Sequence, residues 1–208
     1  TFLLESLASN PKAPAWLAHS KRSLSMKLWL YIFVTVSYSL FTHITLAATT
    51  PTPEQSEEQG WLAFQRGAFE EAVLSWQNAV QLYERQKKRE NQAEALVHLS
   101  QAYQAVGQYQ EALKALESAL VLADKSGDPV LHASVLANLG NVYGAIGQVD
   151  KAAGYLHDGV SRAKAQGDAQ LASIILNDWG NLLWTQGRFS EASVAYKESK
   201  TFADKTGN

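Results

Sequence analysis

Few side chains in this sequence are spaced for catalysis or metal binding. The chain has no cysteine, which removes thiolate ligands, disulfides and cysteine nucleophiles. Its five histidines form no i, i+4 pair and no HExxH motif, so we expect helix-surface or partly buried rings and not zinc ligands. Ser100 belongs to a column of small packing residues described below, which is the simpler explanation for it. We therefore expect no metal site, no cofactor and no catalytic residue in this chain.

Two other patterns have a simple structural explanation. Gly140, Gly144 and Gly147 resemble a glycine-rich phosphate loop, but they lie within a helix and its turn and not between a strand and a helix. The acidic pairs at 57–58 and 70–71 suit the first turn of a helix, where the dipole favours negative charge.

Four asparagines in helical patterns are the remaining chemical signal, because asparagine is a poor residue in the middle of a helix. Its amide offers both a donor and an acceptor, which suits the main chain of an extended peptide. The alternative is a hydrogen bond to a neighbouring helix or a turn carbonyl, and the sequence leaves both open. These residues are Asn138, Asn141, Asn177 and Asn181.

The overall charge argues against a nucleic-acid partner. The chain has 18 basic and 20 acidic residues, a net charge of −2, whereas phosphate binding needs a clustered positive excess. The only dense basic run is 85–89, between two helical patterns, where we expect a solvated turn.

The N-terminal part has the features of a secretory signal peptide. Met26 and Lys27 precede an apolar run over 28–42, and small residues at Thr45 and Ala47 suit cleavage before Ala48. An uncleaved membrane anchor is the alternative. Because Met26 is the only methionine, we expect residues 1–25 to be upstream read-through. Cleavage would leave a net charge of −5, since residues 1–47 hold four basic residues and one acidic residue.

The rest of the chain repeats every forty residues without an insertion. Equivalent segments begin at Glu57, Val97, Ala137 and Asn177. Three columns of small residues recur at this period. They are Gly67, Gly107, Gly147 and Gly187; Ala72, Ala112, Ala152 and Ala192; and Gly60, Ser100, Gly140 and Gly180.

Each column has an expected mechanical role. The first glycine column falls where the apolar phase breaks, so it supplies the positive φ of a tight turn. The alanine column lets the returning helix cross closely, and the third column lies where a bulky side chain would separate two helices. Gly127-Asp128 and Gly167-Asp168 end the second helix of a unit, and the aspartates cap the next. The predicted helices are 53–66, 69–89, 92–106, 109–125, 129–146, 149–165, 169–186 and 189–205.

The predicted fold is therefore all-α, an α-α superhelix or solenoid of four stacked helical hairpins preceded by an N-terminal signal segment. The expected organisation is read-through over 1–25, a signal peptide over 26–47, a flexible lead over 48–54 and the array over 55–208. Its units are about 53–90, 91–128, 129–168 and 169–208.

The repeat resembles the tetratricopeptide repeat. In the third unit the resemblance is carried by Leu136, Leu139, Gly140, Tyr143, Gly147, Ala152 and Leu156. The forty-residue spacing is similar to the variant in kinesin light chains and in bacterial arrays that precede a caspase-like CHAT peptidase domain. The resemblance implies a concave face built from the first helix of each hairpin, and on it peptide binding.

The resemblance places twelve residues on that face: Trp61, Phe64, Val97, Gln101, Gln104, Ala137, Asn138, Asn141, Asn177, Asp178, Asn181 and Trp184. Of these, the candidate peptide groove comprises Gln101, Gln104, Asn138, Asn141, Asn177, Asn181 and Trp184. Asn141 and Asn181 are favoured because they share a column. Trp184 is either an aromatic anchor or packs against a following helix. The lysines and arginines that clamp a peptide carboxylate in the family are missing beside these asparagines, which disfavours such a ligand.

The sequence thus favours an exported scaffold that binds a peptide or partner protein and has no catalysis of its own. The alternative is the N-terminal regulatory array of a longer enzyme of the CHAT type, with the C-terminal domain of the same chain as partner. A third hypothesis is self-assembly through the last hairpin. We expect the natural protein to continue beyond Asn208, where the repeat phase would start another helix. The expected location is secreted or periplasmic after cleavage near Ala47/Ala48, with only transient membrane contact.

Overall fold

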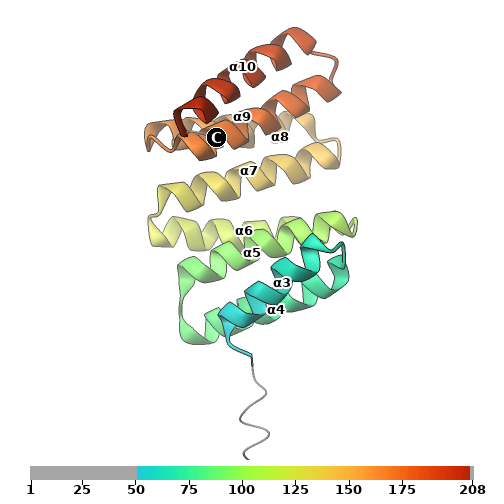
Figure 1. Cartoon of the computed structure of the whole chain (residues 1–208), viewed down its shortest axis with the longest axis vertical. Helices are drawn as coiled ribbons and strands as arrows, with labels where there is room; N and C mark the ends of the chain where they lie inside the picture. The colour runs from blue at the N-terminus through green and yellow to red at the C-terminus, as the bar shows by residue number, and fades with distance from the viewer. Residues whose placement is uncertain (1–50, 207–208) are drawn as a thin grey trace, which may run out of the picture. The chain divides into compact units, whose positions relative to one another are not determined.

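The computed structural model describes residues 51–206, and these residues form helices and turns without a β-strand. The predicted signal segment and the residues before it lie outside the described part. Consecutive helices lie side by side in chain order (Figure 1). They are α3 (Pro53–Gln65), α4 (Phe69–Gln86), α5 (Arg89–Ala105), α6 (Tyr109–Ser126), α7 (Pro129–Ala145), α8 (Val149–Ala165), α9 (Ala169–Thr185) and α10 (Phe189–Thr206).

Most predicted helix ends differ from the observed ones by one residue or less, and the exception has a clear cause. α4 ends at Gln86 and not at residue 89, and α5 begins at Arg89 and not at residue 92. Lys87 adopts a left-handed conformation with φ 59° and ends α4. It occupies the position that Gly127 and Gly167 hold in later units. Because this position lacks a glycine, the sequence does not indicate where α4 ends.

The predicted start of the first helix at residue 53 is confirmed. α3 begins at Pro53, so residues 53 and 54 belong to the helix and not to the lead assigned to 48–54. The Thr52 side chain accepts a hydrogen bond from the Gln55 backbone, and the Gln55 side chain accepts one from the Thr52 backbone. This reciprocal capping, with proline in the first turn, fixes the start of the helix.

The turn columns behave as predicted. Gly67, Gly107, Gly147 and Gly187 have φ of 79°, 75°, 77° and 72°, a region that residues with a Cβ rarely adopt. The Asp128 carboxylate accepts from the backbone of Val130 and Leu131, and Asp168 accepts from Leu171. The repeated glycines therefore end helices, and the aspartates begin the next ones.

The packing columns are confirmed as well. The alanine column is fully buried. A Cβ added at Gly60 would lie 2.6 Å from the Trp76 indole, at Gly140 2.6 Å from Leu156 Cγ, and at Gly180 2.5 Å from the Tyr196 ring. Each glycine thus faces the large side chain sixteen residues later, on the partner helix of its own hairpin.

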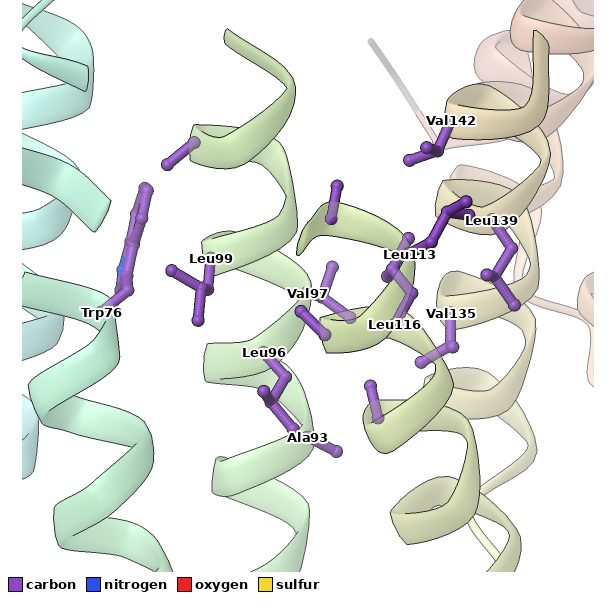
Figure 2. Close-up of a cluster of buried hydrophobic side chains, with 14 of the residues drawn as sticks. Trp76, Ala93, Leu96, Val97, Leu99, Leu113, Leu116, Val135, Leu139 and Val142 are labelled. Atoms are coloured by element: carbon purple, nitrogen blue, oxygen red, sulfur yellow. The ribbon is translucent and has the colours of Figure 1, made fainter. Parts of the chain in front are cut away.

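These contacts join into a core that continues from one hairpin to the next. Figure 2 shows Trp76 of α4, Leu99 of α5, Leu116 of α6 and Leu139 of α7 lying across consecutive helices. The first helices also touch one another, α5 with α7 and α7 with α9. The side of the array formed by α3, α5, α7 and α9 is called the first-helix face below.

Changing Gly140 to valine is expected to lower the free energy of unfolding by about 1–3 kcal/mol, because the branched side chain would overlap Leu156. Chemical unfolding followed by circular dichroism measures the change. Gly154→Val is the matched control, since a Cβ there meets nothing within 4 Å, and less than about 0.5 kcal/mol is expected. Equal losses in both variants would contradict the packing role of this column.

Candidate functional site

Polar side chains join neighbouring hairpins across the first-helix face. The Gln101 amide on α5 donates to Asn138 Oδ1 on α7 at 3.2 Å, and the Asn141 amide on α7 donates to Asp178 Oδ2 on α9 at 2.8 Å. Both pairs are separated by 37 residues, so a residue on one first helix lies beside a residue one helical turn earlier on the next.

Between α3 and α5, the positions equivalent to Gln101 and Asn138 hold aromatic side chains. Trp61 on α3 and His98 on α5 are also 37 residues apart, and their ring centroids are separated by 4.7 Å. A contact at this position therefore recurs in every junction between first helices. The residue on the later helix changes from His98 to Asn138 to Asp178 along the array.

Asn141, Asp178 and Asn181 lie together in a groove on the first-helix face. The groove has a cavity volume of about 230 Å³ and is also lined by Gly144 and Thr185. Asn181 Oδ1 accepts a hydrogen bond from the Tyr196 hydroxyl at 2.9 Å, so its amide nitrogen is available at the opening. The two asparagines that share a sequence column thus lie in one groove, together with Asp178 of α9.

The other sequence candidates lie outside this groove. Gln104 donates weakly to the Ser100 carbonyl of its own helix at 3.4 Å, and Asn138 donates to the Ser134 carbonyl at 2.9 Å. Asn177 is exposed. Trp184 is 57% exposed and packs edge-on against Phe189, with ring centroids 4.8 Å apart.

Two positions expected on the concave face are part of the core instead. Val97 and Ala137 are 5% and 4% exposed. They lie one turn before Gln101 and Asn141 on the same side of their helices, where side chains of neighbouring helices cover them. They therefore pack between helices and are not available to a ligand.

Asp178 is the residue that the sequence reasoning undervalued. Burial raises the pKa of its carboxyl group, and the hydrogen bond from Asn141 opposes that shift. Among residues 51–206 it forms no ion pair. The signal in the sequence was a lone acid in an apolar helix rich in asparagine. Such a carboxylate gains from a cationic or hydrogen-bond-donating partner.

The first helices α3, α5, α7 and α9 carry mostly negative charge. Arg89 is the only lysine or arginine within α3, α5, α7 and α9. A second groove, of about 310 Å³, brings Glu94 near Asp128 and Asp168, and burial together with Asp128 and Glu90 raises the pKa of Glu94. The acidic residues within the four first helices are Glu54, Glu57, Glu58, Glu90, Glu94 and Asp178.

The described residues contain no cluster of three or more histidine, aspartate or glutamate side chains arranged to hold a metal ion. None of the helices between residues 51 and 206 combines the length and apolar character needed to cross a bilayer.

The described part of the chain defines a class of protein, an α-helical repeat array in which antiparallel hairpins stack in chain order. Residues 59–125 match the family model of the tetratricopeptide repeat, and the same hairpin recurs through α10. The chain therefore contains tetratricopeptide repeats. The sequence has no significant match among curated proteins.

Solved structures share this fold at low sequence identity. The TPR-like repeats of a putative kinesin light chain from Podosopora anserina match with a TM-score of 0.58 and 20% identity, over 90% of this chain and 95% of that one. BtubC from P. vanneervenii matches with a TM-score of 0.62 and 17% identity, over 77% and 68% of the two chains. A Rap protein complexed with competence and sporulation factor matches with a TM-score of 0.67 and 15% identity, over 97% of this chain but 57% of its own.

Proposed function

We propose that this protein is a non-catalytic scaffold that binds an extended segment of a partner protein along its first-helix face, with a basic side chain of that segment at Asp178. The observation that carries the proposal is the half-buried Asp178 carboxylate, which lies in a groove between two asparagines and has an amide as its hydrogen-bond donor. A guanidinium or ammonium group would supply the missing positive charge.

The asparagines suit the rest of such a segment. Asn141 and Asn181 offer amide groups at equivalent positions of successive hairpins, and an extended main chain presents donors and acceptors at a regular spacing. The acidic groove at Glu94 extends the same preference toward the earlier hairpins. The Rap protein of the same fold is complexed with competence and sporulation factor, which supports a binding role.

The test is selection of binders from a random-peptide phage library against the full chain, followed by calorimetry on the selected peptides. We expect enrichment of lysine and arginine, and binding to Asp178→Asn weaker by roughly tenfold or more, because the substitution removes the charge but keeps the contact with Asn141. Binding to the wild type is also expected to weaken as the pH falls, since burial raises the pKa of Asp178 and favours its neutral form.

Asp158→Asn is the matched control, because Asp158 is an exposed acid on the second helix α8. It is expected to leave the affinity unchanged. Selection of peptides without basic residues, or equal affinities for the wild type and Asp178→Asn, would show that the first-helix face does not bind a positively charged side chain.

We also propose that the protein acts outside the cytoplasm, on the basis of the apolar segment 28–42 and the small residues before Ala48. N-terminal sequencing of the protein from its natural source is expected to begin at Ala48. A product that retains residues 26–47 would indicate the membrane-anchored alternative.

A further inference from the structure

A pocket on the opposite side of α9 is separate from the first-helix face. It lies between α8 and α10, has α9 as its floor and has a cavity volume of about 370 Å³. Its α9 residues Trp179 and Leu183 each lie two positions from Asn181, which is about 200° around a helix. The two sites therefore lie on opposite faces of α9.

The preceding groove of the same array shows what normally fills this space. Tyr143 on α7 and Tyr155 on α8 stack with ring centroids 5.4 Å apart and planes 6° from parallel. Both rings pack against the core to which α6 contributes. Forty residues later, the equivalent positions are Leu183 and Ala195, and both line the pocket.

The groove before that one also contains a tyrosine. Tyr103, equivalent to Tyr143, receives a hydrogen bond from the Gln77 amide of α4 at 2.6 Å. Thus the grooves between α4 and α6 and between α6 and α8 each hold a ring of the chain itself. The groove between α8 and α10 has lost both rings.

The lining of the pocket indicates the kind of group it accepts. Its inner surface is apolar, with Leu156, Val160 and Leu176 beside the Trp179 indole. A flat ring placed there would stack on or pack against an aromatic surface, the arrangement that the tyrosine pair forms one repeat earlier.

The charges at the rim are already compensated. Lys164 Nζ lies 2.6 Å from Glu198 Oε1, and Glu191 is paired with the Arg188 guanidinium. A charged ligand would therefore find no unpaired counter-charge at the rim, and entering the apolar interior would remove its water. An uncharged ring suits the pocket better.

We propose that the pocket between α8 and α10 receives an uncharged aromatic side chain, tyrosine or phenylalanine, from a partner protein. The ring takes the place that Tyr155 occupies in the preceding groove. Since this pocket faces away from Asp178, a partner can occupy it while the first-helix face holds another segment.

The test uses the full chain with two probes, p-cresol and N-acetyltyrosine N-methylamide, and follows the Trp179 indole signal by NMR. Both probes are expected to give saturable shifts at Trp179. Ala195→Tyr restores the ring that the preceding groove has, so it is expected to weaken both probes at least tenfold while circular dichroism stays unchanged. Glu117→Gln, at an exposed position on α6 away from the pocket, is expected to leave these shifts as they are.

The reverse substitution tests the same idea without filling the pocket. Tyr155→Ala opens the groove between α6 and α8 and is expected to create a second p-cresol site with shifts near Tyr143. Absence of saturable shifts at Trp179, or equal shifts in Ala195→Tyr, would overturn the proposal. Binding of p-cresol without binding of the tyrosine amide would overturn the assignment to a side chain on a protein.

Discussion

Replacing Trp76 with alanine is expected to lower the free energy of unfolding by about 3–5 kcal/mol, the range for removing a large aromatic side chain from a core. Trp76 is fully buried in α4. Its ring centroid lies 5.5 Å from that of Trp61, 5.7 Å from Phe64 and 5.6 Å from His98. Its indole nitrogen has no hydrogen-bond partner, so packing alone holds this side chain.

Chemical unfolding measures the total loss, and amide hydrogen exchange locates it. Because each hairpin of a repeat array contacts only its neighbours, protection is expected to fall first in α3, α4 and α5 and to persist in α8, α9 and α10. Trp184→Ala is the matched control, since Trp184 is largely exposed, and less than about 1 kcal/mol is expected. Similar losses in the two variants would mean that the aromatic cluster is not a core.

Lowering the pH from 7 to 4 is expected to remove about 3 kcal/mol of stability through His98 alone. Burial between aromatic rings lowers the pKa of this imidazole from 6.5 to about 4. Between these two values the unfolded chain binds a proton that the folded chain does not. The stability is therefore fully present above about pH 6.5 and is lost as the pH falls toward 4.

His98→Phe isolates this contribution, because the substitution keeps a ring beside Trp61 and Trp76 and removes the titrating group. The measurement is the free energy of unfolding at several values of pH for both proteins. The difference between the two curves is expected to grow as the pH falls from 6.5 to 4. Because both proteins share the other ionisable groups, taking the difference removes their contribution. Parallel curves over this range would show that His98 is protonated without penalty in the folded protein.

The helical framework could be predicted because its signals are local. A glycine at 67, 107, 147 or 187 allows a left-handed turn whatever surrounds it, and the aspartates at 128 and 168 cap a helix within three residues. The one helix junction that was predicted wrongly, at Lys87, lacks this signal. There the neighbouring hairpins impose the turn on a residue that does not favour it.

The candidate site was predicted only in part. The sequence column pairs Asn141 with Asn181, and both residues line one groove in the structure. The contact between Asn141 and Asp178 depends on the offset of one helical turn between successive hairpins, which no pattern within a single helix contains. For the same reason the sequence did not separate Asn177, which is exposed elsewhere, from its neighbours.

The sequence by itself determined the number of helices between residues 51 and 206, their turns and the small residues through which they touch, because backbone conformation and helix periodicity act over a few residues. Only the tertiary structure decided which polar groups meet across hairpins and where a groove stays open. The pocket between α8 and α10 exists because Leu183 and Ala195 stand where Tyr143 and Tyr155 stack one repeat earlier. Such a space is defined by what three helices leave unfilled, and it forms only when they pack together.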